Sequence, residues 1–130
     1  MIRLRTIAFV AVGMALTGAA AQAADGKQMF LDNCSACHQP TGKGIPGAFP
    51  ALAGSKVATG PAADAASVVL NGRGGMPSFR NDLSDADIAT ILSYVRSAWG
   101  NKASPLTAQV VASRRRAGTK ENAGAALTAH

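Results

Sequence analysis

The clearest helical pattern of apolar residues runs from Ser84 to Trp99. Serine is a favoured helix N-cap, and the two aspartates of the first turn complement the helix dipole. The apolar side chains recur at three- and four-residue spacing, so they share one face: Ile88, Ile91, Leu92, Val95 and Trp99. Gly100 and Asn101 then end the pattern. The stretch predicts an amphipathic helix with one face against a core.

Three other stretches show weaker helical patterns: residues 26–37, residues 61–70, which open with a proline, and residues 107–116, which have little apolar face. Residues 40–60 hold eight prolines and glycines, too many for a regular element, and predict a long loop. No alternating apolar run is long enough for a sheet, so the pattern predicts an all-α fold. Residues 117–130 are mostly small and are expected to be mobile.

The first 23 residues have the three parts of a secretory signal. Arg3 and Arg5 supply the positive start, an apolar run of about 15 residues follows, and residues 21–23 read Ala-Gln-Ala, a small-x-small cleavage pattern. A membrane-spanning helix needs about 20 residues. We therefore expect cleavage near Ala23-Ala24, export to the periplasm, and no stable membrane insertion of the mature chain. The remainder divides into a domain at residues 24–104 and a basic, Ala-rich extension at residues 105–130.

Charge and composition narrow the possible partners. The chain carries 13 Lys and Arg against 7 Asp and Glu, but much of this excess lies in the extension, around Arg114–Arg116. Aromatic residues make up only 5% of the chain. A basic face with interleaved aromatics, as nucleic-acid binding requires, is therefore missing. The arginine run could steer an acidic partner, although such runs are usually just solvated. A domain of about 80 residues with few aromatics often relies on a disulfide, metal or cofactor.

Residues 34–38 read Cys-Ser-Ala-Cys-His, the spacing of c-type haem attachment. Two thiols three residues apart on a helical turn can reach the two vinyl groups, and His38 then offers an imidazole to the iron. A bare Cys-x-x-Cys also allows a zinc half-site, a structural disulfide or a redox dithiol. Zinc lacks further ligands, since His130 is the remaining histidine. A dithiol site would need a strand before Cys34, and a short disulfide loop contributes little stability.

If His38 binds one side of a haem iron, Met76 is the best candidate for the other side. It follows Gly72, Gly74 and Gly75, which let the backbone approach a flat cofactor closely, and Pro77 favours an extended conformation at Met76. Methionine with histidine is a known axial pair that favours the ferrous state. Met29 lies in the first predicted helix, where packing is its default role.

These features together resemble the class I cytochromes c, and the C-terminal half is similar to bacterial cytochromes that serve periplasmic dehydrogenases. The resemblance covers about residues 24–116. It rests on Gly26 and Phe30 ahead of the cysteines, the CSACH motif, FPALAG at residues 49–54, GGMPSF at residues 74–79, and the Ser84 helix leading to Trp-Gly-Asn. The resemblance implies a class I cytochrome c fold, with three main helices and long loops around one covalent haem c.

The resemblance also implies roles for single residues. The Pro50 carbonyl would accept the Nδ1 proton of His38, and Leu52 would pack on the haem. Gly26 would let the first helix cross the last one closely, with Phe30 against Ile91 and Tyr94.

The function implied is a periplasmic carrier that passes single electrons between a dehydrogenase or respiratory complex and a cytochrome or terminal oxidase. It would not be an enzyme. The alternatives are a haem enzyme or gas sensor with a displaceable methionine and, more remotely, a thiol-disulfide oxidoreductase.

Overall fold

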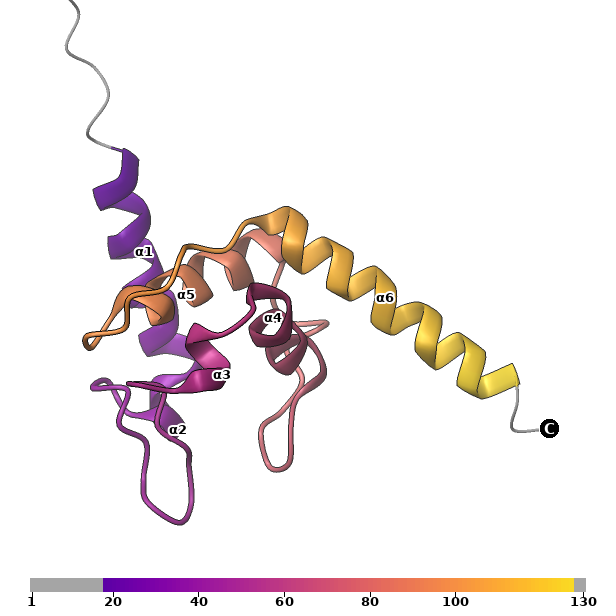
Figure 1. Ribbon diagram of the computed structural model, residues 1–130, viewed down its shortest axis with the longest axis horizontal. Coiled ribbons are helices and arrows are strands. Elements are labelled where there is room, and N and C mark those ends of the chain that lie inside the picture. The colour runs from indigo at the N-terminus through magenta and orange to yellow at the C-terminus, as the bar shows by residue number, and fades with distance from the viewer. Residues whose placement is uncertain (1–17, 128–130) are drawn as a thin grey trace, which may run out of the picture.

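The computed structural model describes residues 18–127. These residues form no strand and six helices: α1 (Gly18–Asn33), α2 (Ser35–His38), α3 (Lys56–Thr59), α4 (Ala62–Asn71), α5 (Asp85–Ser97) and α6 (Ala108–Leu127) (Figure 1). The predicted all-α class is confirmed. Most of the predicted export signal, residues 1–17, lies outside the described part of the chain, as does His130.

Helix α5 is the central element, and its start is fixed by a reciprocal cap. The Ser84 hydroxyl accepts a hydrogen bond from the Asp87 amide at 3.1 Å, and the Asp87 carboxylate accepts one from the Ser84 amide at 3.1 Å. The helix ends at Ser97, two residues before the predicted end, and Trp99 then takes a positive φ of 53°. The predicted helix of residues 84–99 is therefore correct except for its capping serine and its last two residues.

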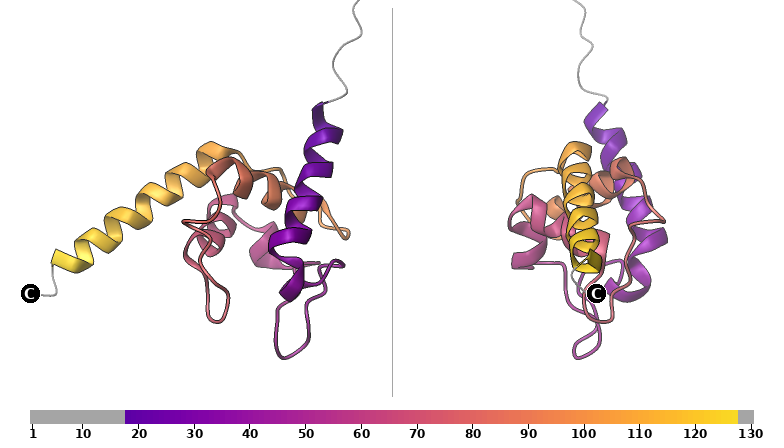
Figure 2. Two further views of the ribbon diagram at one scale, coloured as in Figure 1. Left: turned by 180° about the vertical axis from the view of Figure 1, so that it is seen from behind. Right: turned by 90° about the vertical axis from the view of Figure 1, so that its right-hand side faces the viewer.

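Helix α5 has two buried faces, so it lies between the other helices (Figures 1 and 2). One face meets α4 and α6 in a cluster of Ala65, Ala66, Leu70, Ile88, Ala89, Leu92, Leu106 and Val111. The other face meets α1 and α3 in a cluster of Phe30, Ala58, Ile91 and Val95, which we call the Phe30 cluster. Burial on both sides stabilises α5 mainly through the apolar surface removed from water.

Helix α1 crosses α5 at Gly26, as the resemblance implied. A Cβ atom at Gly26 would lie 2.8 Å from the Thr90 carbonyl oxygen and 2.9 Å from the Tyr94 Cβ. Phe30 continues the contact, with its ring centroid 5.7 Å from that of Tyr94. Only a residue without a side chain fits at Gly26, so the glycine sets how closely the two helices approach.

Three predicted boundaries need correction. The predicted helix of residues 26–37 is two helices, because α1 begins at Gly18, ends at Asn33 and is followed by the short α2. The loop predicted for residues 40–60 contains α3, which begins where the Ser55 hydroxyl accepts a hydrogen bond from the Ala58 amide at 3.2 Å. The second predicted helix is shifted by one residue, since proline acts as its N-cap.

The C-terminal extension is helical for longer than its sequence predicted. Helix α6 continues to Leu127, through residues that were expected to be mobile. Its first turn packs on the domain, since Val111 is fully buried, and Leu106 just before the helix is 6% exposed. The Ser93 hydroxyl accepts from the Leu106 amide at 2.9 Å, which holds the start of the extension against α5. The later turns extend outward from α4 and α5 (Figure 1).

Two long loops, residues 39–55 and 72–84, extend to the same side of the helices in all three views (Figures 1 and 2). The first follows the cysteine motif and the second carries Met76. Within residues 18–127, no helix is both long enough and apolar enough to cross a bilayer.

Candidate functional site

The two cysteines and the histidine of the motif lie on one turn, with Cys34 between α1 and α2 as the N-cap of α2, and Cys37 and His38 within α2. The Cys34 amide donates to the Phe30 carbonyl at 2.9 Å, and the His38 amide donates to the Cys34 carbonyl at 3.0 Å. The backbone thus stays nearly helical through the junction. The thiols of Cys34 and Cys37 are unpaired and half-buried, and His38 is buried. Both thiols and the imidazole are therefore available on a single turn.

His38 is oriented by the loop that follows it. Its Nδ1 lies 2.9 Å from the Pro50 carbonyl oxygen. Because a carbonyl only accepts, Nδ1 carries the proton in this bond, and the lone pair on Nε2 is left for a metal. The His38 carbonyl accepts from the Gly44 amide at 2.9 Å, which fixes the loop to the same residue from its other side. This is the contact that the resemblance implied for Pro50.

Leu52, the other pocket residue implied by the resemblance, is half-buried. It packs at the edge of the Phe30 cluster, which Cys34 also touches. Its amide donates to the Gly42 carbonyl at 2.7 Å. Leu52 therefore joins the cysteine turn to the apolar core from the loop side.

Asn101 anchors this loop to the end of α5, a role that the sequence alone did not indicate. Its side chain is 7% exposed. Its Nδ2 donates to the Leu52 carbonyl at 3.1 Å and to the Val95 carbonyl at 2.8 Å, and its Oδ1 accepts from the Gly54 amide at 2.8 Å. Both donor positions and one acceptor position of this amide side chain therefore join the loop to the end of the helix.

Trp99 holds the beginning of the same loop. Its Nε1 donates to the Pro40 carbonyl at 3.1 Å, and its ring packs against Phe30 at a centroid distance of 5.1 Å. A Cβ at Gly42 would overlap the indole ring, and Gly42 has a positive φ of 65°. Glycine is therefore required there for two independent reasons.

Arg96 is a buried cation that sequence reasoning missed. It is 5% exposed, and its guanidinium donates to the carbonyls of Ala58 at 2.8 Å, Gly60 at 2.9 Å and Ser104 at 2.7 Å. The signal was present in the sequence, because Arg96 follows Leu92 by four residues and so lies on the apolar face of its helix.

Met76 lies on the second long loop, in a tight hairpin. The Met76 amide donates to the Arg73 carbonyl at 3.0 Å, and the Arg73 amide donates to the Met76 carbonyl at 3.2 Å. Gly72 lies so close that a Cβ would meet the Met76 carbonyl oxygen and the backbone at Pro77. The Met76 side chain is half-buried. Among the described residues, no hydrogen bond joins this loop to the loop of Pro50.

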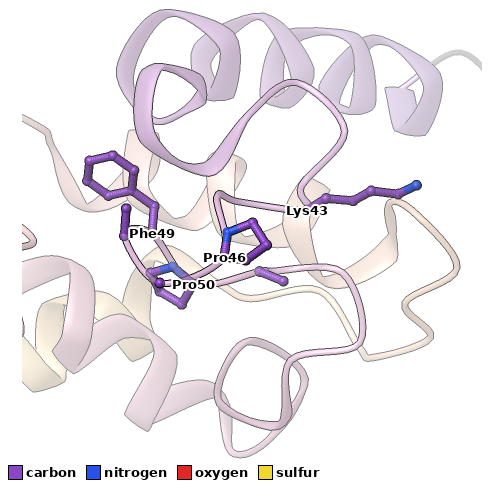
Figure 3. A pocket seen from close by; sticks show the side chains of 7 residues that line it. Lys43, Pro46, Phe49 and Pro50 are labelled. Carbon is purple, nitrogen blue, oxygen red and sulfur yellow. The ribbon is translucent and has the colours of Figure 1, made fainter.

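The surface near the Pro50 loop carries apolar side chains that the protein leaves uncovered. Ile45 is 42% exposed and Phe49 39% exposed, and Val57 of α3 is 43% exposed. A shallow hollow of about 310 Å³ lies along this loop (Figure 3), lined by Lys43, Pro46, Gly47, Ala48, Phe49, Pro50 and Ala51. The motif cysteines, His38 and Met76 do not line this hollow, so we do not assign the haem to it.

The environment of Cys34 does not favour a nucleophilic thiol at that position. Burial, together with the neighbouring Cys37 thiol, raises the pKa of Cys34 to about 11. A redox-active thiol instead needs a lowered pKa, because the thiolate is the nucleophile. The described residues also contain no strand to lead into a redox Cys-x-x-Cys motif. For a zinc site, the same residues contain no group of three or more His, Cys, Asp or Glu side chains placed to hold a metal ion.

The arrangement fits a covalently attached haem. Two unpaired thiols share a turn with an imidazole whose Nε2 is free, and exposed apolar side chains lie on the loop that orients this imidazole. Cys34 and Cys37 would tether the group, and His38 would bind its iron.

Comparison with known proteins agrees with this geometry. Residues 21–95 match the family model described as "Cytochrome C oxidase, cbb3-type, subunit III". The chain is 38% identical over 103 residues to cytochrome c-552 of Thermus thermophilus, covering 66% of this chain and 68% of that protein. It is 41% identical over 85 residues to cytochrome c6 of a Picosynechococcus species, covering 58% and 73%.

A third relative is much longer. The cytochrome c subunit of the quinone alcohol dehydrogenase of Gluconobacter oxydans is 35% identical over 101 residues, and the match covers 68% of this chain and 21% of the subunit. The chain thus spans about a fifth of that protein.

Proposed function

Because this chain belongs to the class I cytochrome c family and binds one covalent haem c, we propose that it carries single electrons in the periplasm, with His38 and Met76 as axial ligands. It is an electron-transfer protein and not an enzyme. The bound haem supplies an iron that alternates between ferric and ferrous states. The chain's own residues hold this group, orient its ligands and exclude competing ligands.

The observation that carries the proposal is the 2.9 Å contact between His38 Nδ1 and the Pro50 carbonyl. It fixes the imidazole ring and its tautomer, and it makes Nε2 a stronger donor to a metal. Cys34 and Cys37 on the same turn would tether the haem so that its iron lies within reach of this nitrogen. Leu52 would cover part of the haem face from the loop.

Met76 is proposed as the second ligand because its hairpin extends to the same side as the Pro50 loop (Figure 1). The close contacts at Gly72 leave the hairpin little freedom. With both His38 and Met76 bound to it, the iron would have no open position for oxygen or peroxide. A thioether ligand also raises the reduction potential, which suits a carrier better than an oxygen-activating site.

We further propose that the partners are redox proteins. One relative is named as a subunit of a quinone alcohol dehydrogenase, and another as subunit CcoP of a cbb3-type cytochrome c oxidase, 34% identical over 90 residues. A dehydrogenase or respiratory complex would supply the electron, and a cytochrome or terminal oxidase would accept it. Export with cleavage near Ala23-Ala24 would place the mature chain among such partners, without membrane insertion or nucleic-acid binding.

Carbon monoxide binding to the reduced holoprotein tests the ligation. We expect the unaltered protein to bind it poorly at neutral pH and Met76→Ala to bind it readily, because the variant has an open axial position. Met29→Ala is the matched control, since Met29 packs against the Phe30 cluster and should leave the affinity low. Ready binding by the unaltered protein would instead indicate a gas sensor or haem enzyme.

The tether has a separate test. The purified holoprotein should keep its haem through acid extraction and show the mass of the chain plus one haem. A mass equal to the bare chain would refute covalent attachment.

A further inference from the structure

Two arginines join the C-terminal helix α6 to the base of the Met76 hairpin. Arg115 donates from one guanidinium to the carbonyls of Arg80 and of Leu83, the latter at 3.0 Å, and to the Asp85 carboxylate at 2.7 Å. In return, Arg80 donates to the Arg115 carbonyl at 2.9 Å and to the Asn71 Oδ1 at 2.7 Å. The two ends of the segment between α4 and α5 are therefore both fastened, directly or through Arg80, to one turn of α6.

The returning arm of the hairpin is also bonded to the last turn of α4. The Phe79 amide donates to the Val69 carbonyl at 3.0 Å, and the Ser78 hydroxyl donates to the Leu70 carbonyl at 2.5 Å. The bridge that carries Met76 lies beyond these bonds. The base of the hairpin is thus held by α4 and by α6 together, and the placement of this base sets where the Met76 side chain lies.

Helix α6 is shaped to receive the Arg80 side chain. A Cβ at Gly118 would lie 2.6 Å from an Arg80 guanidinium nitrogen. Glycine is unfavourable inside a helix by about 1 kcal/mol relative to alanine, and here it leaves room for the guanidinium. The neighbouring arginines do not take part: Arg114 pairs with Asp64 of α4 at 3.3 Å, and Arg116 is exposed.

We infer that Arg115 is a positioning residue for the axial methionine, which acts by fastening the base of the Met76 hairpin to α6. The inference rests on the proposed ligation by Met76. In this role the extension is part of the electron-transfer site, although it lies outside the predicted domain. Loss of the Arg115 bonds removes the attachment of this base to α6, leaves only its attachment to α4, and makes the Met76 ligand easier to displace.

The test compares Arg115→Met with Arg114→Met in the full-length holoprotein. Both variants lose one cation of the same helix, but only the first loses bonds to the hairpin segment. We expect Arg115→Met to bind carbon monoxide at least tenfold more tightly in the reduced state and to have a lower midpoint potential. Arg114→Met should change neither. Arg115→Lys keeps a cation near Asp85 but not the fork, and should lie between them.

General loss of stability must be separated from loss of positioning. Val111→Ala loosens the packing of the same helix on its core without touching the hairpin. If Val111→Ala raises carbon monoxide affinity as much as Arg115→Met does, the effect is general stability and the inference is wrong. An unchanged affinity in Arg115→Met also overturns it, even if that variant is destabilised. Failure of Met76→Ala to bind carbon monoxide would instead refute the ligation itself, independently of Arg115.

Discussion

Replacing Asn101 by alanine should destabilise the protein more than any exposed asparagine would. The substitution removes three hydrogen bonds and leaves the carbonyls of Leu52 and Val95 and the amide of Gly54 without these partners. Each bond contributes roughly 0.5–1.5 kcal/mol, so the loss should be about 3 kcal/mol. Small domains are stable by only about 5–15 kcal/mol, so this is a large fraction of the total.

Asn101→Asp separates the donor bonds from the acceptor bond. A carboxylate can still accept from the Gly54 amide, but it faces two carbonyl oxygens to which it cannot donate. Burial and these oxygens should raise the pKa of the new carboxyl in the folded state. Stability relative to Asn101→Ala is then greatest below the unfolded pKa of an aspartate, about 3.9, and is lost as the pH rises through the raised folded pKa.

Guanidinium denaturation followed by circular dichroism measures both variants. Asn81→Ala is the control, because Asn81 is exposed and its replacement should change the free energy of unfolding by less than about 0.5 kcal/mol. A loss below about 1 kcal/mol in Asn101→Ala would refute the anchoring role. A pH-independent difference between Asn101→Asp and Asn101→Ala would refute the account of the two donor bonds.

Two further substitutions test the packing of the helices. Gly26→Ala gains about 1 kcal/mol of helix propensity. However, its new methyl group would overlap the Thr90 carbonyl and the Tyr94 Cβ, which are fixed to the backbone of α5, and such overpacking costs about 1–3 kcal/mol. The net change should be destabilising in denaturant titration, and a more stable variant would contradict this crossing. Arg96→Met leaves three backbone carbonyls without their donor and should lower the free energy of unfolding by about 3 kcal/mol. Arg96→Lys should lower it less, because an ammonium group can still donate to some of these carbonyls. Equal losses in a thermal melt would show that the donors of Arg96 are unimportant.

Local signals predicted the parts of the molecule that depend on neighbouring residues. The helix after Ser84 was predictable because its cap, its acidic first turn and its apolar period agree. The turn of Cys34, Cys37 and His38 was predictable from spacing alone. Helix α3 was missed because the surrounding prolines and glycines hid a serine cap at Ser55.

The missed parts depend on residues far apart in the sequence. Asn101 is bonded to residues 47 and 49 positions away, and Arg115 to residues 30 to 35 positions away. The spacing of apolar residues within one helix carries no information about such contacts. Helix α6 has almost no apolar stripe beyond Val111, so the bonds of Arg115 and Arg80 that help to hold it to the domain could not be seen from its own sequence.

The crossing of α1 and α5 bears on the order in which the chain matures. Residues 34–84 lie between these two helices, and closing so long a loop costs entropy before its contacts form. Phe30 has no Tyr94 or Ile91 to pack on until α5 has emerged. The topology therefore leaves the cysteine turn without this packing until α5 has been made, and favours covalent attachment of the haem before the crossing closes. Closure of the helix crossing would then bury a haem that is already attached to Cys34 and Cys37.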